Sequence, residues 1–235
     1  MRHTPGLFLL VAAALAAAAP AAAQTGFPFQ DEGLHYTVNW PSGLSLGDAT
    51  LSAHHTANGW DFEIGLDAAV PGFAIQDKFK ASTTVGLCST GLSRDISQGG
   101  KKVKEKTAFD QDKGTAHRAT EYPADGGTSD FNISPCARDA IAYVYFGRKE
   151  LGQGRVPPAQ QIYFGSAYAV RMEYTGAQTV TVGDKQEVTD HLMVAVKGPK
   201  SDFTVEVFYA RDAARTPLLI KIPQAVGTLS MELVR

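Results

Sequence analysis

The sequence is poor in cysteine, has no large excess of either charge and contains no long apolar run beyond its first residues. Its 235 residues include 22 Lys and Arg against 24 Asp and Glu, and only two Cys. This balance and a pI near 6.3 do not suggest non-specific binding to nucleic-acid phosphates or anionic lipid surfaces, which needs clustered Lys and Arg side chains. We therefore expect no nucleic-acid partner.

Recognisable catalytic and metal-binding motifs are also absent. No H-x-H or H-E-x-x-H pattern occurs, and the adjacent His54 and His55 would point to opposite faces of a strand. Residues 110–114 resemble the start of a calcium loop, but the later ligands are missing, so a turn is the better interpretation. Gly165–Ala167 is not a nucleophile elbow. The sequence therefore predicts a non-enzymatic protein without catalytic residues, metal site or cofactor.

The N-terminus has the features of an export signal. Arg2 precedes an apolar stretch from Leu7 to Ala19, and Pro20 and three alanines follow. This arrangement is typical of a cleaved secretory signal, whereas a membrane anchor needs about 20 apolar residues. We expect residues 1–23 to be removed after Ala23. Residues 24–235 would then form a single β-rich domain, exported to the periplasm and without a membrane span.

Cys88 and Cys136 are the two cysteines of the chain. In an oxidising compartment the simplest expectation is that they form a disulfide, which would stabilise the fold by closing a long loop. Two buried free thiols are the alternative. A zinc site is disfavoured because no second pair of ligands accompanies them.

Alternation of apolar and polar residues dominates the rest of the chain. Every second residue from Leu34 to Trp40 is apolar, and Trp60–Ala68 repeats the pattern, as expected for strands with one buried face. Turn signals such as Asn58-Gly59 separate the strands without intervening helices, which favours consecutive antiparallel pairing. We expect a mainly β protein of about 10–12 strands in one strongly curved meander sheet, an open or half barrel. A β-sandwich is the alternative.

One segment departs from the alternation. Ser134 followed by Pro135 predicts a helix start, and Gly147 predicts the helix end. The residues between them are apolar or aromatic on nearly every side, which indicates a short buried helix. We expect it to lie in the concavity of the sheet, with Cys136 at its start pinned to a strand by the disulfide.

Two groups of residues at this helix are candidates for function. Arg138 and Asp139 would place charges in its first turn, either as functional groups or as an ordinary complement to the helix dipole. Aromatic side chains would either line an apolar cavity between sheet and helix or belong to an ordinary core. These aromatic candidates are Tyr36, Phe73, Phe79, Tyr143 and Phe146.

Several stretches of the chain form a recognisable series when they are taken in order. They are Glu32–Trp40, Leu46–Leu51, Phe109-Asp110, Cys136–Arg148, Asp212–Pro217 and Gly227–Leu233. Together they resemble a broad bacterial family of exported proteins, the domain of unknown function DUF3108. The resemblance implies a periplasmic β-rich protein with no assigned activity and no family catalytic residues. It also implies an architecture similar to the half-barrel lipoprotein carriers of the periplasm, whose concave face receives acyl chains and is covered by helices.

These observations lead to two functional hypotheses. In the first, the protein binds a hydrophobic or amphipathic ligand, such as a lipid or an envelope intermediate, between the curved sheet and the helix. In the second, it is a structural or assembly factor of the cell envelope that acts through a protein partner at a sheet edge or an exposed patch. An enzyme is disfavoured because nucleophile, metal and cofactor patterns are missing.

Overall fold

A computed structural model describes residues 30–70, 72–224 and 227–235. The expected signal segment, residues 1–23, lies outside the described residues. The first half of the described chain is an antiparallel meander in which each strand pairs with the next. Its hairpins include the one predicted at Asn58-Gly59, where Thr56 pairs with Gly59. The strands are β1 (Glu32–Asn39), β2 (Ser45–Thr56), β3 (Gly59–Val70), β4 (Phe73–Thr84), β5 (Ser89–Gln98), β6 (Lys101–Asp110), β7 (Thr115–Tyr122) and β8 (Thr128–Asn132).

The second half contains the helix and a second meander. A two-residue strand leads into the helix and pairs in parallel with the strand that follows the helix. The later strands pair antiparallel in chain order. These elements are β9 (Arg138–Asp139), α1 (Ala140–Gly152), β10 (Gln160–Tyr163), β11 (Ala167–Val182), β12 (Lys185–Gly198), β13 (Ser201–Ala210), β14 (Pro217–Gln224) and β15 (Gly227–Leu233).

Pairing of the first strand with the last joins the two meanders into one sheet. Tyr36 of β1 lies opposite Leu233 of β15, and the hydroxyl of Tyr36 donates a hydrogen bond to the carbonyl of Pro217, 2.8 Å away. The described residues form a single 15-stranded sheet that ends at β8 and β9. A continuous sheet confirms the curved open barrel and excludes the sandwich.

The described residues form 15 strands, more than the expected 10–12, and two of the additional strands are short and lack an apolar alternation. β8 is largely polar, and β9 has two residues. They form the two ends of the sheet, where a strand needs only one hydrogen-bonded neighbour.

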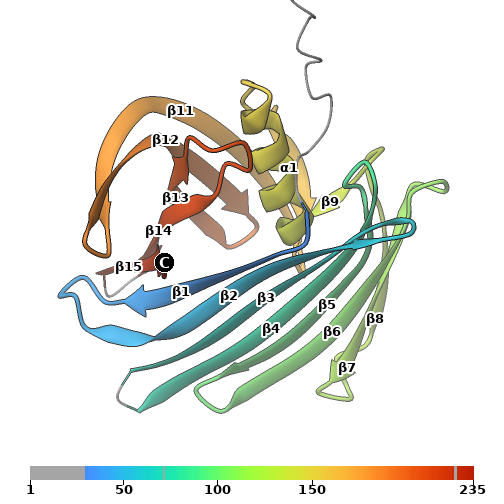
Figure 1. Ribbon diagram of the computed structural model, residues 1–235. Coiled ribbons are helices and arrows are strands. Elements are labelled where there is room, and N and C mark those ends of the chain that lie inside the picture. Colours follow the sequence, from blue (N-terminus) through green and yellow to red (C-terminus); the bar gives the residue numbers. More distant parts are fainter. Residues whose placement is uncertain (1–29, 71, 225–226) are drawn as a thin grey trace, which may run out of the picture.

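The sheet curls until its two ends approach each other. Figure 1 shows the broad N-terminal meander, with β11–β14 curled over it and α1 held between the two parts. Near the ends of the sheet, the ring of Phe131 stacks on that of Tyr163 at 5.4 Å between centroids. The guanidinium of Arg118 donates to the carbonyl of Gly165. Side chains therefore bridge the gap that strand pairing leaves open.

The predicted ends of the helix are wrong, although its existence and burial are confirmed. Ser134 and Pro135 precede α1, and the N-cap is Asp139. Cys136 therefore does not start the helix, and Arg138 and Asp139 lie before it on β9 rather than in its first turn. Gly147 lies within α1, where a Cβ atom would come within 2.8 Å of the Met172 side chain. This glycine permits close packing against β11 and does not end the helix.

Candidate functional site

The start of α1 is held by a fully buried carboxylate. Asp139 accepts hydrogen bonds from the backbone N–H groups of Ile141 at 2.7 Å and Ala142 at 3.0 Å, which satisfies donors that a helix leaves free at its first turn. Its second oxygen accepts from the Ser89 hydroxyl on β5, at 2.6 Å. Burial raises the pKa of Asp139 to about 6, with these hydrogen bonds opposing the shift. The cap therefore attaches the helix directly to the sheet.

The segment before the helix is fastened to the same region. Cys88 and Cys136 form the expected disulfide, which joins the β4–β5 connection to the chain leading into β9. The Gln111 side chain donates to the carbonyls of Ser89 and Ala137 and accepts from the Ala137 N–H. These bonds hold Ala137 against the sheet, and the chain then continues as strand β9 up to Asp139, which is why the helix begins later than its sequence predicts.

The other end of α1 is held by a buried ion pair. The Arg148 guanidinium, with no exposed side-chain surface, contacts both carboxylate oxygens of Glu32 on β1. Its Nε donates to the carbonyls of Ala214 and Arg215. A buried cation with this many acceptors is well compensated. The helix is thus fixed to the sheet at both of its ends.

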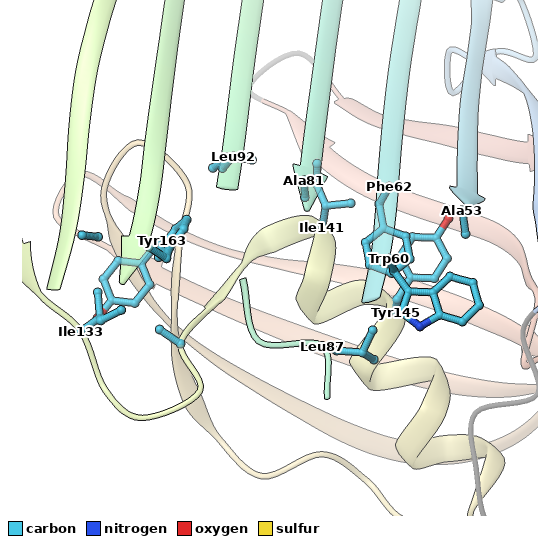
Figure 2. Packing of buried hydrophobic residues seen from close by; sticks show 13 residues of the cluster. Ala53, Trp60, Phe62, Ala81, Leu87, Leu92, Ile133, Ile141, Tyr145 and Tyr163 are labelled. Atoms are coloured by element: carbon cyan, nitrogen blue, oxygen red, sulfur yellow. The ribbon is translucent and has the colours of Figure 1, made fainter. Parts of the chain in front are cut away.

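The side of α1 that faces the N-terminal strands is filled by aromatic rings. The ring of Tyr145 stacks on Phe62 of β3 with centroids 4.0 Å apart, and Trp60 stacks on Phe62 at 6.2 Å. Figure 2 shows these three rings together beside the helix, with Leu87 and Ile141 nearby. Ala53 and Ala81 are also buried in this cluster. We call this side of α1 the filled flank.

The opposite side of α1 faces β10–β14 across an apolar cavity of about 190 Å³. We call this side the open flank. Its wall consists of six valines, five other apolar residues and two tyrosines, and no charged residue lines it. These residues are Val144, Val170, Val194, Val196, Val205 and Val207; Ala140, Ile162, Met172, Pro217 and Ile220; and Tyr143 and Tyr209.

The two tyrosines provide the polar atoms of side chains in this wall. Tyr143 projects from α1 and Tyr209 from β13, and both are nearly fully buried. Desolvation raises the pKa of Tyr209 to about 12 and raises the pKa of Tyr143 well above its usual range. Both hydroxyl groups therefore remain protonated near neutral pH and can act as hydrogen-bond donors.

The structure separates the five predicted aromatic candidates. Tyr143 lines the cavity, and Phe146 lies beside it, with ring centroids 6.4 Å apart, without lining the cavity itself. Tyr36 is buried in a third cluster between β1, β2 and β15. Phe79 packs on Phe164 next to the filled flank. Phe73 is 43% exposed at the start of β4, so its expected place between sheet and helix is wrong.

The valines of β12 and β13 were not identified from the sequence. Their signal is present, because Val194 and Val196 alternate on one strand and Val205 and Val207 on the next. Alternation identifies the buried face of a strand but not the element packed against that face. Only the curling of the sheet brings these side chains to α1.

A second cavity of about 360 Å³ lies where the ends of the sheet approach each other. Its wall mixes aromatic rings with polar side chains, among them Phe131, Tyr163, Arg118 and Gln161. Arg118 already bonds to Gly165 across the gap. This cavity is part of the seam that holds the curled sheet together, and the apolar cavity at α1 is the better candidate site.

The described part of the chain has neither a cluster of metal ligands nor a helix suited to crossing a membrane. Within residues 30–70, 72–224 and 227–235, no group of three or more His, Cys, Asp or Glu side chains is arranged to hold a metal ion. In the same part of the chain, no helix has the length and apolar character needed to cross a membrane.

Comparison with known proteins identifies both a family and a fold. The family model described as "Protein of unknown function (DUF3108)" matches residues 35–234. The crystal structure of a β-barrel-like protein of domain of unknown function DUF1849 from Brucella abortus is similar to this chain, with a TM-score of 0.63 and 8% sequence identity. The similarity covers 87% of this chain and 96% of that one. At this identity the likeness shows the fold alone. No curated protein matches the sequence.

Proposed function

The chain belongs to the DUF3108 family of proteins of unknown function, and we propose that it is a non-enzymatic binding protein for an amphipathic molecule. An apolar chain of that molecule enters the open flank of α1. The observation that carries the proposal is the cavity of about 190 Å³ with an almost wholly apolar wall. Ligand sites are typically concave and lined mainly by apolar side chains, and an apolar wall offers water few hydrogen-bond partners.

The size of the cavity limits what enters it. An apolar cavity of about 150 Å³ accommodates a benzene molecule, whereas sites for drug-sized ligands span roughly 300–1,000 Å³. A cavity of about 190 Å³ therefore suits part of one unbranched chain or a single ring. The rest of a larger lipid would lie outside.

The same proposal places the protein in the periplasm. Its support is the sequence of residues 1–23, with a basic start, an apolar core and a small-residue end. In that compartment, lipids and envelope intermediates supply molecules with apolar chains that need shielding from water. The open flank would provide that shielding for one chain.

The test compares ligands that copurify with two variants of the exported chain. Val194→Phe fills the cavity from β12, whereas Val188→Phe makes the same change at a position of β12 that is 54% exposed. We expect extraction and mass spectrometry to recover an apolar-chain molecule from the wild type and from Val188→Phe, and to recover much less from Val194→Phe. Equal recovery from both variants, or none from the wild type, would contradict the proposal.

A second candidate function, the binding of a protein partner, is favoured by three exposed apolar side chains. Leu44, Phe73 and Tyr122 are 63%, 43% and 50% exposed. Leu44 directly precedes β2, Phe73 begins β4 and Tyr122 ends β7. Figure 1 shows these ends of β2, β4 and β7 on the same side of the meander. A protein partner that covers this side would bury all three side chains. Photo-crosslinking from position 44 tests this role, and a reproducible partner that is lost in Phe73→Ser would support it.

A further inference from the structure

Tyr143 lines the apolar cavity, and its hydroxyl is a buried polar group without a partner among the described residues. Its side chain lines the cavity and is 3% exposed. Its oxygen is buried and has no hydrogen-bond partner among the described residues. Burial raises the pKa of this hydroxyl, so it is protonated and free to donate.

Such a group is unfavourable for the empty protein. A buried hydroxyl without a partner has given up its bonds to water and gained none in return. A phenylalanine ring would fill the same space without that loss. Tyr145, two residues further along α1, differs because its hydroxyl interacts with the carboxylate of Glu32. An acceptor atom brought by a ligand would give the Tyr143 hydroxyl a partner as well.

A positive charge lies near the same end of the cavity. Arg138 is opposite Ile162 in the β9–β10 pairing, and Ile162 lines the cavity. The guanidinium carbon of Arg138 lies 3.7 Å from the centre of the Phe146 ring. Its charge lowers the pKa of Tyr143 against the larger effect of burial. The positive charge of Arg138 therefore also acts on a ligand atom bound to the Tyr143 hydroxyl.

The orientation of Arg138 leaves further capacity for an anion. One terminal guanidinium nitrogen donates to the Gln160 side chain at 3.1 Å, and the other donates to the Gly86 carbonyl at 3.5 Å and contacts the Cys136 sulfur at 3.2 Å. The charge of Glu150 also acts on this guanidinium. The Nε atom is buried and has no partner within the part of the chain that the structure describes. One uncompensated donor on a partly buried cation favours a negatively charged or strongly polar neighbour.

Resting on the proposed function, we infer that the ligand is a fatty acid or an acyl ester, bound with its carboxyl or ester oxygen at the Tyr143 end of the cavity. That oxygen accepts a hydrogen bond from the Tyr143 hydroxyl, and the charge of Arg138 favours the carboxylate. The aliphatic carbons lie against the valines of β12 and β13. A hydrocarbon leaves Tyr143 without a partner, and a chain with a cationic end is repelled by Arg138.

The experiment uses the purified chain after removal of bound lipid and four probes of equal chain length: octanoate, methyl octanoate, n-octane and octyltrimethylammonium. We expect calorimetric titration to show octanoate binding roughly 10- to 100-fold, and the ester roughly 3- to 10-fold, more tightly than n-octane, because a hydrogen bond to a charged acceptor is stronger than one to a neutral acceptor. Tyr143→Phe removes this preference while n-octane binding remains. Its melting temperature is not lowered, because no protein hydrogen bond is lost.

Tyr145→Phe is the matched control on the same helix. It removes a hydroxyl from the filled flank, so we expect lower thermal stability and unchanged affinity for octanoate. Arg138→Gln should lower the affinity for octanoate more than the affinity for methyl octanoate. Equal losses of affinity would contradict the role of the charge. Unchanged octanoate and ester affinity in Tyr143→Phe would overturn the inference while leaving the proposed function in place.

Two measurements on the wild type keep the outcomes distinct. Octanoate, and not n-octane, should shift the NMR resonances of the Tyr143 ring, and identical shifts from both probes would overturn the inference. Tighter binding of octyltrimethylammonium than of octanoate would also overturn it. If none of the four probes binds the wild type, the proposed function itself fails.

Discussion

The two flanks of α1 are packed in different ways. On the filled flank, the flat rings of Phe62, Tyr145 and Trp60 stack against one another. On the open flank, short branched side chains of β10–β14 face the helix and leave about 190 Å³ between them. Stacked rings fill space in a core at nearly crystalline density, whereas valine side chains are too short to reach across it. One helix therefore serves as an anchor on one side and as the wall of a cavity on the other.

The two flanks should differ most in the free energy of unfolding that is lost when one side chain on each flank is shortened. Phe62→Ala removes the central ring of the stack and should lower the free energy of unfolding by about 3–5 kcal/mol. Val207→Ala, beside an existing cavity, should lower it by about 1.5 kcal/mol. Urea denaturation of both variants measures the difference. Equal losses would mean that the two flanks are packed alike.

Removal of the disulfide tests how much this covalent bond contributes to holding the segment before α1 on the sheet. Cys88→Ala and Cys136→Ala should each lower the free energy of unfolding by about 2–4 kcal/mol, because each removes the same crosslink. The double variant should be nearly as stable as either single variant. Thermal denaturation of the three proteins under oxidising conditions provides the comparison, and additive losses would be inconsistent with one shared bond.

Enlarging a side chain on each flank sharpens the comparison. Ala81 is buried in the filled flank, so Ala81→Leu should cost about 1–3 kcal/mol through overpacking. Val194 lines the cavity, so the longer side chain of Val194→Leu has room there and should change the free energy of unfolding by less than about 1 kcal/mol. Melting temperatures of the variants report the two effects. A large loss in Val194→Leu would show that the open flank has no room for added atoms.

A pH dependence of stability is expected at the start of α1. Burial raises the pKa of Asp139 to about 6, above its value in the unfolded chain, so the folded protein binds the proton more tightly. The stability that this proton contributes is fully present below about pH 4 and is lost as the pH rises through about 6. Asp139→Asn keeps a capping oxygen without this ionisation. Unfolding measured from pH 4 to 7 should have a smaller slope in Asp139→Asn than in the wild type.

The strands were easier to predict than the ends of the helix, for a physical reason. Period-two alternation in Leu34–Trp40 or Trp60–Ala68 is a property of consecutive residues. The start of α1 is set instead by contacts with Ser89 on β5 and with Gln111 in the β6–β7 turn. Ser134-Pro135 has the composition of a helix start, but those distant side chains keep it outside the helix.

The candidate site was only partly predictable. Tyr143 was singled out because it lies on a helix that is apolar all round, and it does line the cavity. Phe73 has the same aromatic character but begins β4 beside a turn and is exposed. Residue type therefore identifies candidates for burial, and position in the sheet decides which of them face α1.

By itself, the sequence determined that the described chain is a mainly antiparallel β protein with one buried helix, since alternation and an all-round apolar segment are local patterns. The tertiary structure decided that β1 pairs with β15, so that two meanders become one sheet curled around α1. It also decided that space remains on one flank of the helix. A cavity is the volume left between side chains from elements far apart in the chain, and no pattern of neighbouring residues specifies how completely they fill it.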